Sequence, residues 1–141
     1  MMNRRHLLAQ GAAWCGPFVW VSASAQATAV DQVSLTEARR LHDAGKAVLI
    51  DIREPEEFAT GVAAGARLLP MSQINQRLRD IPTDPSVPVL LICRTQNRSS
   101  ATLRALRKQL GEEKYSHVRF VQGGMSEWVQ RGWPTVQPAK P

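Results

Sequence analysis

The residue of this chain most able to do covalent chemistry is Cys93. It directly follows the apolar run 89–92, and arginines stand close by at positions 94 and 98. The thiolate is the nucleophilic form of cysteine, and it is favoured by nearby cations and by backbone amides at the start of a helix. An inert core cysteine gains nothing from two neighbouring arginines, so we predict a reactive thiol that is able to carry an attached anionic sulfur.

Helices and strands alternate along the chain and place this thiol at the end of a strand. Unbroken apolar runs have strand length, while capping residues, prolines and glycines bound the helical segments between them. The expected elements are a helix over 34–44, a strand over 47–50, a short helix over 54–60, a strand over 66–69, a helix over 72–80, a strand over 89–92, a helix from 99 or 100 to 110, a strand over 118–121 and a helix over 125–130. This pattern predicts a single α/β domain with a parallel sheet of about five strands and helices on both faces. Ligands of such sheets bind beyond the carboxyl ends of the strands, which is where Cys93 stands.

The first 25 residues predict an export signal. A positive start with Arg4 and Arg5 precedes the apolar stretch 7–21, and the small residues 23–25 resemble a cleavage site. The stretch contains glycine and proline and is shorter than the roughly 20 apolar residues of a membrane anchor. Residues 3–8 resemble a twin-arginine signal, which leaves the general and the twin-arginine routes both open. We expect a cleaved signal peptide, a bacterial periplasmic location and no membrane attachment after cleavage.

The composition fits one exported domain with a single thiol. The chain has 141 residues, of which 43% are hydrophobic and 21% charged, as is ordinary for one globular domain. Loss of Arg4 and Arg5 would lower the formal net charge from +6 to +4, and the remaining basic residues are scattered, which argues against a nucleic-acid partner. Cleavage also removes Cys15, so Cys93 would remain as a lone thiol in an oxidising compartment.

Three separated motifs resemble those of the rhodanese family, in particular its single-domain exported members of the phage shock protein E type. Residues 93–98 resemble the family's six-residue active-site loop. Residues 51–58 are similar to its aspartate-x-arginine-x-x-x-glutamate-phenylalanine signature, and Gly123-Gly124-Met125 with Trp128 resembles its C-terminal motif. The resulting division is a signal peptide over 1–25, a linker over 26–31, a rhodanese-like domain over 32–134 and a loose tail over 135–141.

The resemblance implies a sulfurtransferase. The sequence has no phosphate-binding glycine loop, metal cluster or nucleotide fingerprint, so we expect no cofactor and no metal. Thiosulfate or a similar donor would load the catalytic Cys93 as a persulfide, and cyanide, a small thiol or a thioredoxin-like protein would then accept the sulfur. The substrate-binding residues that it implies are those between the thiol and the helix: Arg94, Thr95, Gln96, Asn97 and Arg98. Arg94 or Arg98 would steer an anionic donor, and Arg98 has an alternative role in pairing with a carboxylate that pins the loop.

Three further residues are expected to support the loop. Ser99 directly follows it in the sequence. Asp51 and Arg53 end another strand at the same edge of the sheet, where a buried salt link that holds the loops together is favoured over contact with substrate.

Two other hypotheses remain open. The chain is alternatively a persulfide carrier or sensor without turnover, or a partner-binding module of the same fold. Gln96 stands where family members commonly have glycine, and a side chain there would alter the backbone path of the loop or narrow the pocket. A phosphatase loop is one residue longer than 93–98, so phosphate chemistry is disfavoured.

Overall fold

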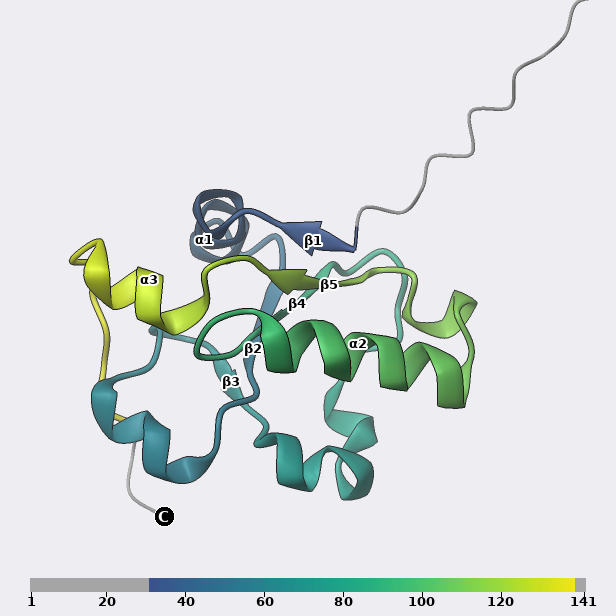
Figure 1. Cartoon of the computed structure of the whole chain (residues 1–141). Coiled ribbons are helices and arrows are strands. Elements are labelled where there is room, and N and C mark those ends of the chain that lie inside the picture. The colour runs from purple at the N-terminus through teal and green to yellow at the C-terminus, as the bar shows by residue number, and fades with distance from the viewer. Residues whose placement is uncertain (1–30, 139–141) are drawn as a thin grey trace, which may run out of the picture.

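Five short parallel strands form one sheet in the computed structural model, which describes residues 31–138 (Figure 1). The strands are β1 (Gln32–Val33), β2 (Val48–Asp51), β3 (Arg67–Leu68), β4 (Val89–Ile92) and β5 (Val118–Val121). Their order across the sheet is β1-β5-β4-β2-β3, so β4 lies at the centre and Cys93 leaves its carboxyl end. The predicted α/β architecture with five parallel strands is confirmed.

Residues 31–138 also form three α-helices and four 3-10 segments, all of which except the last α-helix lie between strands. They are α1 (Leu35–Asp43), η1 (Pro55–Thr60), η2 (Met71–Gln76), η3 (Leu78–Asp80), α2 (Asn97–Leu110), η4 (Glu113–Tyr115) and α3 (Gly124–Gln130). Ser34 begins α1 by accepting a hydrogen bond from the Glu37 amide, as a capping serine does. The helix expected over 72–80 is wrong, because Arg77 leaves the helical region at φ −122° and divides the segment into η2 and η3.

Each face of the sheet packs against its own helices. Along β4, Val89 and Leu91 point to the side of α2, whereas Leu90 and Ile92 point to the side of α1 and α3. All four side chains are buried, as an unbroken apolar run in a central parallel strand requires. Cys93 continues the alternation and lies in the cluster on the α2 side.

The two ends of the described region are tied to the domain. The side chain of Arg107 donates to Asp31, a residue of the expected linker. At the other end, Val136 exchanges two backbone hydrogen bonds with Val62, so the expectation of a loose tail is wrong for this part of it. The expected signal peptide, residues 26–30 of the linker and residues 139–141 lie outside the described residues. Within 31–138, no helix has the length and apolar character needed to cross a membrane.

Candidate active site

Cys93 lies at the point where the central strand passes into the loop before α2. Its side chain is fully buried, with 0% of its surface exposed. The thiol donates a hydrogen bond to Ser99 Oγ over 3.5 Å, and Ser99 Oγ donates onward to the carbonyl oxygen of Gln96 over 3.1 Å. Ser99 is itself buried, so it holds the thiol and the loop backbone together from the first turn of α2.

α2 begins at Asn97, so the last two residues of the loop 93–98 are also the first two residues of the helix. Gln96 is the residue before the helix, and its φ of −145° lies outside the left-handed region that favours glycine. The φ at this position therefore does not require a glycine, although family members commonly have one there. Four loop side chains are exposed to solvent: Arg94, Thr95, Gln96 and Asn97.

The start of α3 holds the loop backbone from the opposite side. The amide of Met125 donates to the Cys93 carbonyl over 2.8 Å, and the amide of Ser126 donates to the Arg94 carbonyl over 2.9 Å. This close approach requires Gly124, because a Cβ at that position would lie 2.1 Å from the Thr95 carbonyl oxygen. From the sequence these glycines belong to a C-terminal motif, with no close contact expected for them; two adjacent glycines are the signal that could have indicated a close approach of backbone to backbone.

Asp51 and Arg53 form a buried ion pair below the loop. Arg53 Nη2 and Asp51 Oδ2 are 2.7 Å apart, and 3% and 1% of the two side chains are exposed. The remaining guanidinium hydrogens donate to the carbonyl oxygens of Glu57 and Gly61 and to the Thr60 hydroxyl. The pair therefore fixes the end of β2 to the middle and the C-terminal end of η1.

Arg98 pairs with Glu57 instead of standing free for a substrate. Its two terminal nitrogens donate to the two carboxylate oxygens of Glu57 over 2.7 and 2.6 Å. These hydrogen bonds lower the pKa of Glu57 from 4.5 to about 2, against the opposing effect of partial burial. The link joins Arg98, the last residue of the loop, to η1. Arg98 therefore has the alternative role considered from the sequence, which is to pair with a carboxylate and hold the loop in place.

Replacing Glu57 by glutamine is expected to lower the free energy of unfolding by about 1–2 kcal/mol at pH 6.5, since the pair is only partly exposed to solvent. The depressed pKa means that the pair stabilises the fold fully above about pH 5 and that this contribution is lost as pH falls toward 2. The difference between wild type and Glu57→Gln should therefore shrink at pH 3 in urea denaturation. Glu113→Gln, at an exposed position, is the control, and an equal loss at both pH values would contradict the assignment.

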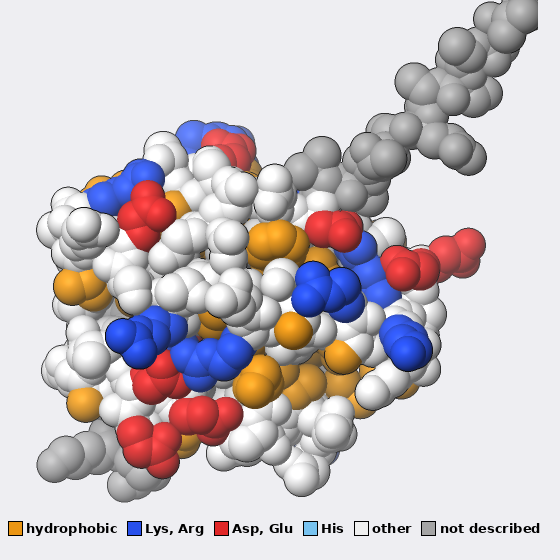
Figure 2. Space-filling model, viewed as in Figure 1, with side chains coloured by type: hydrophobic (Ala, Val, Ile, Leu, Met, Phe, Trp, Pro, Cys, Tyr) orange, Lys and Arg blue, Asp and Glu red, His pale blue; other side chains and the backbone are white. Residues whose placement is uncertain are grey.

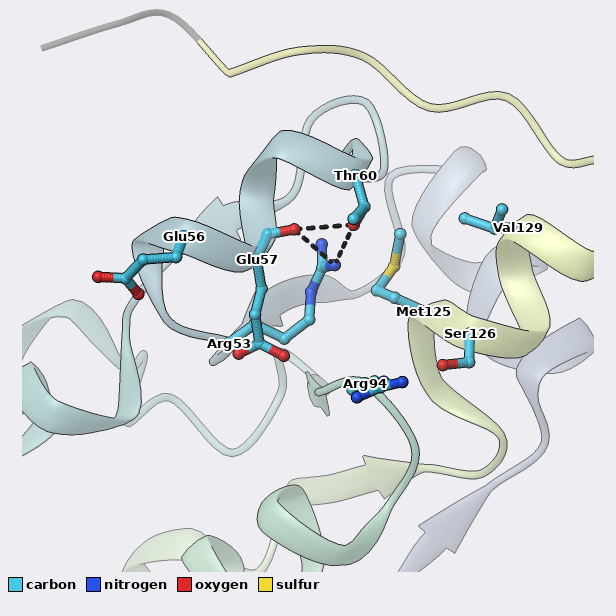
Figure 3. Close-up of a pocket in the computed structure, with 8 residues that line it drawn as sticks. All are labelled: Arg53, Glu56, Glu57, Thr60, Arg94, Met125, Ser126 and Val129. Atoms are coloured by element: carbon cyan, nitrogen blue, oxygen red, sulfur yellow. Dashed lines mark hydrogen bonds between the residues drawn. The ribbon is translucent and has the colours of Figure 1, made fainter.

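A pocket of about 520 Å³ opens between η1 and α3, next to the loop (Figure 3). Its lining residues are Arg53, Glu56, Glu57, Thr60, Arg94, Met125, Ser126 and Val129. Figure 2 shows basic and acidic side chains gathered on this face, between α3 and η1. Arg94 is the loop arginine that has no carboxylate partner among residues 31–138, so it is the cation available to an anionic ligand there. In the same region of the chain, no group of three potential metal ligands comes together.

The arrangement of loop, pocket and sheet has counterparts in known proteins. The model of the rhodanese-like domain matches residues 34–131, most of the described region. This chain belongs to the rhodanese-like domain family. A sulfurtransferase of Allochromatium vinosum is 36% identical over 109 residues, which cover 77% of this chain and 94% of that protein. An uncharacterized protein of Bacillus subtilis is 41% identical over 95 residues, covering 67% of this chain and 71% of its own length.

Solved structures agree with the rhodanese assignment. A rhodanese-related protein of Thermoplasma volcanium superimposes with a TM-score of 0.61 at 27% identity, covering 76% of this chain and 98% of its own. A human single-domain sulfurtransferase gives a TM-score of 0.59 at 28% identity and covers 72% and 96% of the two chains.

The three rhodanese motifs meet at one place in the structure. Residues 51–58 reach the loop 93–98 through the Glu57–Arg98 pair, and residues 123–128 reach it through the amides of Met125 and Ser126. Segments far apart in the sequence thus hold one six-residue loop.

Proposed function

We propose that this protein is a sulfurtransferase that moves a sulfane sulfur from thiosulfate, or a similar donor, to a thiophilic acceptor through a persulfide on Cys93. The Cys93 thiolate attacks the outer sulfur of thiosulfate, a new S–S bond forms to Sγ, and sulfite leaves with the electron pair of the broken bond. Cyanide or a thiolate then attacks the outer sulfur of the persulfide. Thiocyanate or a new persulfide departs, and the Cys93 thiolate is regenerated.

The observation that carries the proposal is the placement of Cys93 on a loop that three other parts of the fold hold in position. Ser99, the amides of α3 and the Arg98–Glu57 pair all fix the loop without occupying the adjacent pocket. In this account Cys93 is catalytic, while Thr95, Gln96 and Asn97 contribute exposed surface and backbone around the substrate. Asp51 and Arg53 act as support because their charges are paired and buried.

Arg94 is proposed to bind the anionic donor, whereas Arg98 is proposed to support the loop. Replacing Arg94 by glutamine is expected to raise the KM for thiosulfate about tenfold, because a charge-assisted hydrogen bond contributes about 1.5–3 kcal/mol. Thiocyanate release at a fixed cyanide concentration measures this effect. Arg104→Gln, which removes an exposed charge on α2 away from the pocket, is the matched control and should leave KM unchanged. A KM for thiosulfate that is unchanged in Arg94→Gln would show that Arg94 does not bind the donor.

The second candidate function is a persulfide carrier that does not turn over efficiently. The complete burial of Cys93 favours it, since a donor or acceptor must reach a sulfur that is 0% exposed. A persulfide that forms on Cys93 but is not discharged by cyanide or small thiols would identify the carrier. Repeated thiocyanate formation would identify the enzyme.

We also propose that the protein is exported to a bacterial periplasm as a single-domain rhodanese of the phage shock protein E type. The support lies in the residue pattern of positions 1–25, with its basic start, apolar stretch and small residues. In that compartment a thioredoxin-like protein is a suitable thiol acceptor, besides small thiols. Mass spectrometry of the protein in separated periplasmic and cytoplasmic extracts tests the export: recovery from the cytoplasmic extract alone, with residues 1–25 still present, would contradict it.

A further inference from the structure

A second pocket, of about 450 Å³, lies at the outer edge of the sheet along β3. It is lined by Ile50, Arg67, Leu68, Leu69, Arg77, Arg79 and Asp80. None of these residues lines the pocket beside Cys93. Three arginines and one aspartate give this lining an excess of two positive charges.

The protein itself holds one of the three guanidinium groups in place. Arg77 donates to the carboxylate of Asp80 over 2.7 Å, to the side-chain oxygen of Gln73 over 3.0 Å and to the carbonyl oxygen of Leu68 over 3.4 Å. A guanidinium carries five N–H donors, so Arg77 keeps donors for a ligand while its position is fixed.

The other two arginines of the pocket form fewer contacts with the protein. Arg67 has one long contact, 3.4 Å from its guanidinium to the Asp80 carbonyl oxygen. Arg79 is exposed and forms no ion pair within residues 31–138. The single carboxylate of the pocket is occupied by Arg77, so it does not neutralise Arg67 or Arg79.

A backbone amide adds a donor of a different kind. The amide of Leu69 donates to the Asp51 carbonyl, toward β2. Successive residues of a strand point their amides in opposite directions, so the amide of Leu68 points away from β2, at the free edge of the sheet. The apolar residues Ile50 and Leu69, both buried, form the inner wall beside it.

We propose that this pocket, which we call the β3-edge site, binds a small organic molecule that carries a dianionic phosphate group. Guanidinium groups and a backbone amide suit the phosphate oxygens, and the excess of two positive charges matches the charge of a phosphate monoester. The volume falls in the range of sites for small organic molecules, about 300–1,000 Å³, and the apolar wall suits an organic body. The site does not depend on the chemistry of Cys93.

Titration of the ¹⁵N-labelled protein with phenyl phosphate tests the proposal, with inorganic phosphate as the second arm. The Leu68 amide resonance should shift saturably with phenyl phosphate, and the affinity should exceed that for inorganic phosphate about tenfold because of the apolar wall. Arg67→Gln and Arg79→Gln should each weaken binding about tenfold, since each removes a charge-assisted contact. Arg104→Gln removes the same charge from an exposed position on α2 and should change the affinity less than twofold.

Three results would overturn the β3-edge site. The first is the absence of a saturable shift at Leu68 with phenyl phosphate. The second is an equal loss of affinity in Arg104→Gln, which would mean a response to net charge alone. The third is equal affinity for phenyl phosphate and inorganic phosphate, which would show that the apolar wall does not bind the organic part of the ligand. Arg77 is left unchanged in this experiment because it supports Gln73, Asp80 and the β3 backbone.

Discussion

Replacing Arg53 by methionine is expected to lower the free energy of unfolding by about 3–5 kcal/mol, because it leaves the Asp51 carboxylate buried without its cation. The substitution also removes the donors that Arg53 supplies to the Glu57 and Gly61 carbonyl oxygens. Urea denaturation followed by circular dichroism measures the change.

Two further variants separate this mechanism from a general loss of charge. The double variant Asp51→Leu with Arg53→Met should recover part of the loss, because it no longer buries an unpaired charge. Arg40→Met, which breaks a solvent-exposed pair with Glu37, should lower the free energy of unfolding far less than Arg53→Met does. A loss in Arg53→Met as small as that in Arg40→Met would show that the buried pair is not a main contributor to the stability of the fold.

Replacing Gly124 by alanine is expected to lower the free energy of unfolding by about 3 kcal/mol or more and to displace the loop that carries Cys93. The backbone of Gly124 has φ +59°, where an L-residue loses about 1–2 kcal/mol, and the new Cβ would lie 2.1 Å from the Thr95 carbonyl and 2.5 Å from the Cys93 carbonyl. Rigid backbone atoms cannot relieve such contacts without moving the loop. Sulfur transfer should therefore fall even where the variant remains folded.

Gly132 offers the matched control for this substitution. It has φ +69°, but an added Cβ would have no neighbour within 4 Å. Gly132→Ala should therefore lower the free energy of unfolding by only the conformational cost of about 1–2 kcal/mol and leave sulfur transfer unchanged. Equal effects of the two alanines on stability and activity would show that the contact with the loop is unimportant.

The bounds of β4 and β5 agree with the sequence-based expectation. β4 is a continuous apolar run, as a central buried strand needs, whereas Arg119 interrupts β5, whose first and last valines are buried. β1 has only two residues, Gln32 and Val33, and exists because its partner β5 offers a free edge. No local sequence pattern predicts such a strand.

The loop could be located from the sequence, but the partners of its charged residues could not. Arg98 and Glu57 stand 41 positions apart, and only the folded chain brings η1 against the start of α2. The contact of Gly124 with the Thr95 carbonyl is equally a product of tertiary packing. Whether position 96 requires a glycine depends on the φ value that the loop adopts, and residue type alone does not determine that value.

Intact mass of the purified protein, before and after thiosulfate and again after cyanide, tests the central claim most directly. Cys93→Ser is the control, and thiocyanate is measured in parallel. The account predicts a gain of about one sulfur atom that cyanide removes, repeated release of thiocyanate, and neither effect in the variant. The absence of a sulfur gain in the wild type, or an equal gain in Cys93→Ser, would contradict sulfur transfer through Cys93.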